Sequence, residues 1–299
     1  IYTQLADSYY NVFDSENAAK WYAKATSKGK SEAETYYRYA QTLKILGKYL
    51  EANKQMDVFA KMIPSDARAK EHLANPNYIP SLANNSKLFD VAQTNINSKG
   101  QSDFGALLTN DNTLYFASTR NSSNKTDKWN NQPYSSLYIQ QSNSVKDFNL
   151  DNTQKHNISS AIFTKDGQTV YYTKNYINKT KNTKIGNLKI YAAKYKNGTW
   201  SEEKELSFNG NYNCAHPTLD QNEKYLYFVS DMPGTLGLSD IFKVEIVSEN
   251  TFSNPINLGK SINTEGRETF PFMSENGTLY FSSDGHLGHG GLDIFYGEY

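Results

Sequence analysis

The sequence predicts a mainly β protein with a short α-helical segment at its N-terminal end. A short aromatic strand pattern occurs four times, and its copies start 56, 56 and 53 residues apart. Such a period, built from short strands, is typical of propeller blades. By contrast, the first 75 or so residues have apolar residues at helical spacing. We therefore predict a β-propeller with four visible four-stranded blades, preceded by a short helical domain. The four copies are Leu114-Tyr115-Phe116, Val170-Tyr171-Tyr172, Leu226-Tyr227-Phe228 and Leu279-Tyr280-Phe281.

Each copy has the same surroundings. Upstream lies a segment with a small residue or proline, at Gly105, Ala161, Pro217 and Pro271. A turn such as Lys165-Asp166-Gly167-Gln168 follows it, and Asp-Gly between apolar runs is a strong hairpin signal because both turn residues must tolerate positive φ. Downstream comes a third strand, such as Asp240-Ile241-Phe242-Lys243, and then an outer segment such as Thr251-Phe252-Ser253. Each repeat therefore predicts one blade of four strands.

Composition restricts the class of partner. The 299 residues include 31 basic and 31 acidic side chains, so no net field favours nucleic acid or an anionic membrane. The single cysteine, Cys214, excludes an intramolecular disulfide. No apolar run approaches the roughly 18 residues that a membrane helix needs. We expect neither nucleic-acid binding nor a transmembrane segment.

The N-terminal segment contains a second repeat, of 34 residues. Leu5-Ala6 aligns with Tyr39-Ala40, and Ala18 aligns with Ala52. This spacing and residue choice resemble the tetratricopeptide repeat. We predict about two such repeats over 1–75, a proline- and asparagine-rich linker over 76–86, and the propeller over 87–299. Leu88–Val91 is expected to close the ring as the missing outer strand of the last blade, since an open edge would expose unpaired backbone groups.

The concave face of the helical repeat is the first candidate site. Tyr37, Gln41 and Lys44 would lie on it, with Tyr10 and Asn11 from the earlier copy. One interpretation is a groove that binds a protein or peptide partner. The alternative is that the repeats only brace the neighbouring domain.

The mouth of the propeller channel is the second candidate site. The residues that precede the small position of each inner strand should ring this mouth if the blades superpose. They are Phe104, Ser160, His216 and Phe270. These side chains could bind a ligand, or they could simply fill the central channel of the propeller.

Local motifs for catalysis or metal binding are weak. Asp231 and Asp240 are nine residues apart, as are Asp284 and Asp293, with glycines between them. Carboxylates around a glycine-rich loop could bind calcium, but neither loop supplies six to eight oxygens, and aspartate also caps turns. The sequence contains no nucleophile elbow, phosphate loop or His-Glu-x-x-His motif. We expect no metal, no cofactor, no catalytic residue and no enzyme activity.

A family resemblance bears on function. Leu226–Asp231 followed by Gly237–Phe242 is similar to the WD40-like propeller repeat of the TolB type, and Leu279–Asp284 followed by Gly290–Phe295 is its last copy. Helical repeats leading into such a propeller resemble the OmpA-family envelope proteins of Bacteroidetes, including the PorE-like component of type IX secretion and gliding. The resemblance implies a periplasmic, outer-membrane-associated adaptor with protein partners, for example an outer-membrane barrel of the PorP/SprF kind. It places peptidoglycan binding in a C-terminal domain that this sequence does not contain.

Two other functions stay open. A propeller that binds a glycan or a peptidoglycan fragment should have aromatic residues around its channel. A propeller hydrolase or lyase should have a polar cluster with carboxylates there, and a scaffold should have an apolar plug.

Overall fold

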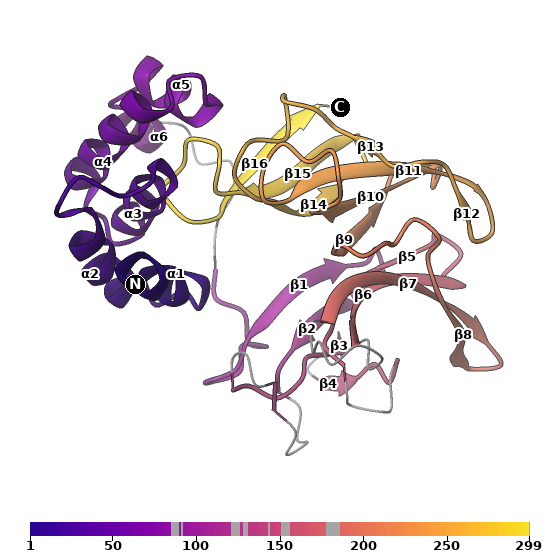
Figure 1. Ribbon diagram of the computed structural model, residues 1–299. Helices are drawn as coiled ribbons and strands as arrows, with labels where there is room; N and C mark the ends of the chain where they lie inside the picture. Colours follow the sequence, from indigo (N-terminus) through magenta and orange to yellow (C-terminus); the bar gives the residue numbers. More distant parts are fainter. Residues whose placement is uncertain are drawn as a thin grey trace. The chain divides into compact units, whose positions relative to one another are not determined.

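The computed structural model describes residues 1–84, 90, 92–120, 126–127, 131–142, 144–150, 156–177 and 186–298 (Figure 1). The chain divides into two compact units. Unit 1 contains Ile1–Asp90, Thr264–Arg267 and Ser282–Phe295, whereas unit 2 contains Val91–Asn263, Glu268–Phe281 and Tyr296–Tyr299. Two segments from the C-terminal part of the chain therefore belong to the compact unit of the helices.

Unit 1 is built from helical hairpins. Within each hairpin α1 packs on α2 and α3 on α4, and α2–α3 and α4–α5 contacts join the hairpins. The fully buried alanines of the 34-residue repeat allow this close approach. The assignment of the hairpins to the tetratricopeptide family stays a prediction. The described helices are α1 (Tyr2–Asn11), α2 (Ser15–Thr26), α3 (Ala33–Ile45), α4 (Tyr49–Met62), α5 (Ala67–Ala74) and α6 (Ile79–Asn84).

Helix α3 ends at a glycine. Gly47 has a φ of 72°, and its N–H donates to the carbonyl of Lys44 at 2.8 Å. The N–H of Lys48 donates to the carbonyl of Leu43 at 2.8 Å. This pair of bonds is a Schellman motif, which satisfies the last carbonyls of a helix and needs a left-handed residue. Gly47 therefore turns the chain from α3 into α4.

Unit 2 contains four antiparallel sheets, which we call blades 1 to 4 (Figure 1). Inner strands of successive blades pack in chain order, β1 with β5, β5 with β9 and β9 with β14. The prediction of a mainly β chain with a four-bladed propeller arrangement is confirmed. The strands are β1 (Asp103–Leu108), β2 (Leu114–Ser118), β3 (Ser136–Gln141) and β4 (Ser144–Asp147) in blade 1; β5 (Ile158–Phe163), β6 (Thr169–Ile177), β7 (Gly186–Lys196) and β8 (Thr199–Glu205) in blade 2; β9 (Cys214–Leu219), β10 (Tyr225–Ser230), β11 (Asp240–Ser248), β12 (Thr251–Phe252) and β13 (Ile256–Asn257) in blade 3; and β14 (Glu268–Met273), β15 (Thr278–Ser283) and β16 (Asp293–Glu298) in blade 4.

Blade 4 has three strands among the described residues. The predicted ring-closing strand at Leu88–Val91 would supply a fourth. Of that segment only Asp90 lies within the described residues, so its pairing stays a prediction.

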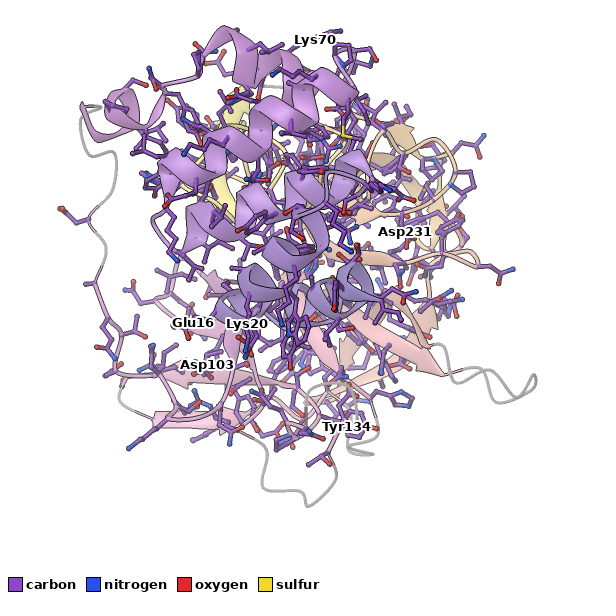
Figure 2. All side chains as sticks on the ribbon, turned by 60° about the vertical axis from the view of Figure 1, so that its left-hand side comes forward. Glu16, Lys20, Lys70, Asp103, Tyr134 and Asp231 are labelled. Carbon is purple, nitrogen blue, oxygen red and sulfur yellow. The ribbon has the colours of Figure 1, made fainter. Side chains whose placement is uncertain are left out.

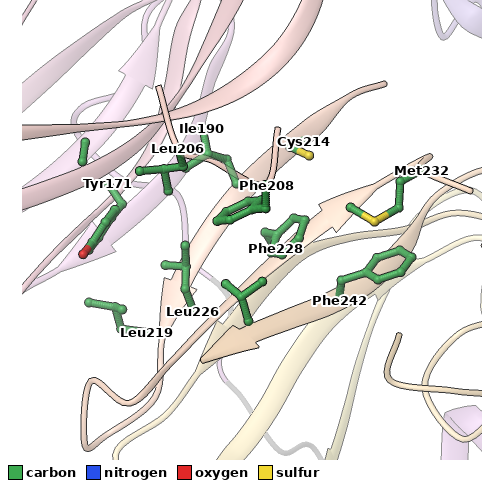
Figure 3. Close-up of a cluster of buried hydrophobic side chains, with 12 residues drawn as sticks. Tyr171, Ile190, Leu206, Phe208, Cys214, Leu219, Leu226, Phe228, Met232 and Phe242 are labelled. Atoms are coloured by element: carbon green, nitrogen blue, oxygen red, sulfur yellow. The ribbon is translucent and has the colours of Figure 1, made fainter. Parts of the chain in front are cut away.

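Apolar clusters hold successive blades together. One such cluster joins blades 2 and 3, where Tyr171 and Ile190 meet Leu219, Leu226 and the surrounding side chains (Figure 3). Cys214 is fully buried in this cluster, and burial raises the pKa of its thiol to about 12. The thiol therefore stays protonated and acts as a small apolar side chain.

Asparagines fix the crossings from one blade to the next. Asn209 accepts from the N–H of Ile190 at 3.1 Å and donates to its carbonyl at 2.8 Å. Asn263 makes the same pair of bonds with Ile241, at 2.8 and 3.0 Å. Each side-chain amide thus makes the hydrogen bonds that a neighbouring strand would make to the third strand of its blade. Sequence analysis did not identify this role, although an asparagine recurs after an outer strand at Asn209 and Asn263.

Candidate functional site

The residues predicted for the concave helical face contact a loop of the same chain within unit 1. Tyr37 donates its hydroxyl to the backbone carbonyl of Asp284. Gln41 donates to the same carbonyl at 2.8 Å and to the Tyr37 hydroxyl oxygen at 2.7 Å. Tyr37, Gln41 and Lys44 are only 3%, 3% and 4% exposed. Binding of a separate partner by these side chains stays a prediction, because in this structure they hold the loop between β15 and β16, which lies within the segment Ser282–Phe295 of unit 1.

Glycines let this loop approach the helix backbone. Gly290 has a φ of 119°, and a Cβ there would lie 2.4 Å from the Cβ of Lys44. A Cβ on Gly288 would lie 2.1 Å from the carboxylate of Asp293, which accepts from the N–H of Gly290 at 3.0 Å. Tyr78 donates its hydroxyl to the carbonyl of Gly288. The loop therefore fits α3 only with glycine at these positions.

The shorter segment Thr264–Arg267 supports the same loop. The N–H of Arg267 donates to the Asp284 carboxylate at 2.6 Å. The guanidinium carbon of Arg267 lies 5.8 Å from the ring centre of Tyr10, and the side chain donates to Asn11 at 3.4 Å. Tyr10 and Asn11, the remaining residues predicted for the concave face, thus contact this segment.

Burial shifts the pKa values of charged groups where the loop meets α3. Burial lowers the pKa of Lys44 to about 8, although the nearby Asp293 opposes the shift. The Lys44 ammonium lies 5.2 Å from the ring centre of Tyr78. Burial also raises the pKa of Asp284, whose carboxylate accepts the Arg267 N–H. Burial of the Lys44 ammonium over an aromatic ring costs free energy. The packed loop keeps the side chain in this position.

The paired aspartates around the glycine loops bind backbone N–H groups. Asp240 accepts from Leu236 at 2.8 Å and from Gly237 at 3.2 Å. Asp231, labelled in Figure 2, accepts from the backbone and the side-chain amide of Asn213, both at 2.6 Å. These contacts agree with the turn-capping interpretation of the carboxylates.

Residues at the propeller axis form a chain of contacts that runs through the blades in order. Ser160, His216 and Phe270 have φ of 45°, 55° and 48° in their inner strands. Ser160 Oγ and His216 Nδ1 are 2.8 Å apart, and the rings of His216 and Phe270 have centres 3.8 Å apart. Burial lowers the pKa of His216 to about 4, so the imidazole is neutral at pH 7.

In blade 1 the residue at the corresponding position is Gly105, one position after the predicted Phe104. Gly105, with a φ of 62°, takes the axial position, and a Cβ on it would lie 3.0 Å from Ser160 Oγ. Phe104 packs instead against the apolar cluster between blades 1 and 2. Strands β1, β5 and β9 each have a one-residue β-bulge here, and their pairing aligns Gly105, not Phe104, with Ser160 and His216. The prediction took Gly105 as the small residue that follows this position, so its choice in blade 1 was one residue too early.

A cavity of about 880 Å³ opens where the turns of all four blades converge, and we call it the turn cavity. Asn110 donates to Glu275 at 3.4 Å across it, joining the turns of blades 1 and 4. Lys165 donates its N–H to Glu223, joining the turns of blades 2 and 3. Three aromatic side chains, Tyr115, Phe163 and Trp200, line one side. Sequence reasoning did not identify this site, although the hairpin turns that form it were predicted.

None of the described helices is both long enough and apolar enough to cross a membrane. Among the described residues no cluster of three or more histidine, cysteine or acidic side chains has the geometry of a metal site.

Comparison with known proteins gives structural likeness alone. No family model matches the chain, and no curated protein matches it. A puromycin-hydrolyzing peptidase of Mycobacterium tuberculosis aligns over 66% of this chain and 28% of its own, with 13% identity and a TM-score of 0.37. An α-L-arabinofuranosidase of Fusarium graminearum aligns over 65% of this chain and 61% of its own, with 14% identity and a TM-score of 0.39. An α-L-arabinanase of Penicillium chrysogenum aligns over 64% and 60%, with 11% identity and a TM-score of 0.40.

The prediction that the chain is not an enzyme is contradicted by this comparison, because these structures with a similar blade arrangement are hydrolases. We withdraw that prediction. The chain spans less than two thirds of each of these proteins, and TM-scores of 0.37 to 0.40 carry no argument about activity, substrate or site.

Proposed function

We propose that this chain is a protein-binding scaffold of the bacterial envelope, located in the periplasm at the outer membrane. The order of a 34-residue helical repeat followed by TolB-like blade repeats supports this setting, since it resembles the OmpA-family envelope proteins of type IX secretion and gliding. In this proposal the partner is an envelope protein built from β-strands, as an outer-membrane barrel is.

An aromatic face on blade 4 supports the binding of a protein. Phe272 on β14, Tyr280 on β15 and Tyr296 on β16 form a stripe, with ring centres 6.5 and 5.9 Å apart. Phe272 is 46% exposed and Tyr296 is 59% exposed. Aromatic side chains that become buried at the centre of an interface supply much of its binding energy. This stripe is the single observation on which the proposal chiefly rests.

The earlier blades indicate what kind of surface such a stripe accepts. Tyr115, at the position of Tyr280 in blade 1, packs on Phe163 in the inner strand of blade 2, with ring centres 4.5 Å apart. Tyr171 in blade 2 is buried in the cluster that contains Leu219 of blade 3. In both cases the residue that packs on the tyrosine is an apolar side chain on a β-strand. We therefore propose a β-sheet of the partner protein as the occupant of the blade 4 stripe.

Site-specific photo-crosslinking tests this proposal. A photoreactive phenylalanine analogue replaces Tyr296 in the full chain, and crosslinking in envelope membranes is followed by mass spectrometry. The matched control places the analogue at Val247, which is 64% exposed on β11. We expect a crosslink to an outer-membrane β-barrel from position 296 and none from position 247.

Three outcomes of this experiment overturn the proposal. They are equal crosslinking from both positions, no crosslink from position 296, and a crosslink only to a second copy of this chain. The last outcome would identify the stripe as a self-association surface.

A further inference from the structure

We propose that the turn cavity of unit 2 binds a neutral oligosaccharide. This inference goes beyond the protein-binding role and does not depend on it, since the cavity lies at the blade turns and shares no residue with the stripe on blade 4. Its volume of about 880 Å³ lies in the usual range of small-molecule sites, roughly 300 to 1,000 Å³.

The aromatic side of the cavity suits the apolar faces of sugar rings. Phe163 contacts Tyr115 and Trp200, with ring centres 4.5 and 5.7 Å away. Phe148 and Tyr195 support Trp200 from other directions, with ring centres 5.6 and 5.2 Å away. Trp200, Phe163 and Tyr115 are each only partly buried, so part of each ring is available to a ligand. A pyranose presents C–H groups on one face, and such a face packs well on a rigid aromatic ring.

The rim of the cavity supplies hydrogen-bonding groups for sugar hydroxyls. The side chains of Asn110, Lys165 and Gln221 are exposed on three different turns and line the cavity. A carboxylate holds each of these turns: Asp111 accepts from Thr109 and Thr113, Asp166 accepts from Thr164 and from the N–H of Gln168, and Asp220 accepts from the N–H of Tyr225. Amide groups held by rigid turns on different blades can orient a ligand with little loss of side-chain freedom.

The charge of the lining excludes anionic ligands. Asp111, Asp220 and Glu275 contribute three carboxylates, whereas Lys165 contributes one ammonium. Hydrogen bonds from Thr109 and Thr113 hold the pKa of Asp111 below its usual value, which keeps it ionised. A phosphate or an acidic sugar would meet net repulsion here, while a neutral sugar would find acceptors for its hydroxyl groups. A cationic peptide is the competing ligand, and the aromatic side favours the sugar because it matches flat C–H faces.

Calorimetric and fluorescence titrations of the full chain test the inference. The probes are neutral hexasaccharides of glucose, mannose, xylose, galactose or N-acetylglucosamine, with hexagalacturonate as the anionic control and hexalysine as the cationic control. We expect at least one neutral probe to bind with millimolar or tighter affinity and to change tryptophan fluorescence. Hexagalacturonate should bind at least tenfold more weakly.

Two variants link the binding to this cavity. Trp200→Ala should weaken binding at least tenfold, and Gln221→Ala at the exposed rim should weaken it severalfold without altering the aromatic cluster. Trp21→Phe, in α2, removes a tryptophan far from the cavity in sequence and should leave both affinity and the fluorescence change intact. Circular dichroism identifies any variant that fails to fold, and in that case Gln221→Ala decides.

The inference is overturned if no neutral probe binds at 10 mM, if Gln221→Ala leaves the affinity unchanged, or if hexalysine alone binds. The last result would reassign the cavity to a cationic peptide.

Discussion

At the scale of single residues, His216 makes the stability of unit 2 depend on pH. Its pKa is about 4 in the folded chain and about 6.5 when unfolded, because burial between Ser160 and Phe270 disfavours the imidazolium ion. Above about pH 6.5 both states are neutral, so this contribution to stability is complete. As the pH falls from about 6.5 to about 4, the unfolded state gains a proton that the folded state does not, and stability is lost.

His216→Asn isolates this effect. Asparagine tolerates the φ of 55° at this position and does not titrate. We expect the urea midpoint of the wild-type chain to fall more between pH 7 and pH 4.5 than that of His216→Asn. His289→Asn, which removes an exposed histidine, is the matched control. Equal slopes for His216→Asn and the wild type would exclude the axial histidine as the source of the pH dependence.

A second residue-scale prediction concerns the buried carbonyl of Asp284. It accepts from both Tyr37 and Gln41. Tyr37→Phe and Gln41→Leu each leave one donor, so each should cost about 1 kcal/mol of unfolding free energy. The double variant leaves the carbonyl without either donor, and burial of an unsatisfied group costs about 1 to 3 kcal/mol. A double-mutant cycle by urea unfolding should therefore show that the double variant loses more than the sum, whereas additivity would show that water replaces the donors.

At the scale of elements, α5 depends on its N-terminal cap. Asp66 accepts from the N–H of Arg68 at 2.8 Å and pairs with its guanidinium at 2.9 Å. Arg68 is buried, and its guanidinium carbon lies 4.1 Å from the ring centre of Tyr37. Removal of Asp66 thus takes away a helix cap and one of the two carboxylates that pair with a buried charge.

Asp66→Ala should therefore cost more than the approximately 1 kcal/mol of an ordinary cap. The matched control is Asp14→Ala, because Asp14 caps α2 by accepting from Asn17 at 3.1 Å and has no arginine partner in the described part of the chain. Hydrogen exchange should accelerate in α5 more for Asp66→Ala than it does in α2 for Asp14→Ala. Similar changes in the two helices would contradict the proposed role of Arg68.

The blades and the axial site differ in how far the sequence could predict them. The blades follow from local patterns, since strand alternation and Asp-Gly turns act over a few residues. Ser160, His216 and Phe270 could be selected from repeat alignment, because each precedes the small residue or proline of its inner strand. Gly105 was missed because it was taken as the small residue of blade 1, whereas the strand pairing aligns Gly105 itself with Ser160 and His216. The turn cavity was missed because its walls come from four separate turns.

At the scale of the whole molecule, the two compact units do not coincide with the helical and strand-forming parts of the sequence. A sequence pattern assigns residues 282–295 to a propeller repeat, whereas this loop belongs to unit 1 with the helices. Tyr37 and Asp284 are 247 residues apart, and no local signal links them. The contact between the concave face and this loop could therefore not be predicted from the sequence. The chain crosses between the two units at five points, and the loop is continuous in sequence with β15 and β16.

The loop should therefore transmit a local defect to both α3 and blade 4. A Cβ at Gly290 would lie 2.4 Å from Lys44 Cβ, whereas a Cβ at Gly277 meets nothing within 4 Å, and both glycines have positive φ. Gly277→Ala should cost about 1 to 2 kcal/mol from backbone strain, and Gly290→Ala should add about 1 to 3 kcal/mol from overpacking.

Hydrogen exchange followed by mass spectrometry separates the two effects. Gly290→Ala should accelerate exchange in α3 and at the loop ends of β15 and β16, because the loop is continuous with both strands and can no longer sit on the helix. Gly277→Ala should affect the β14–β15 turn and leave α3 unchanged. An unchanged α3 in Gly290→Ala would mean that the loop moves away from the helix at little cost. In that case the concave face would be open to a partner, and the hydrogen bonds from Tyr37 and Gln41 would contribute little to holding unit 1 together.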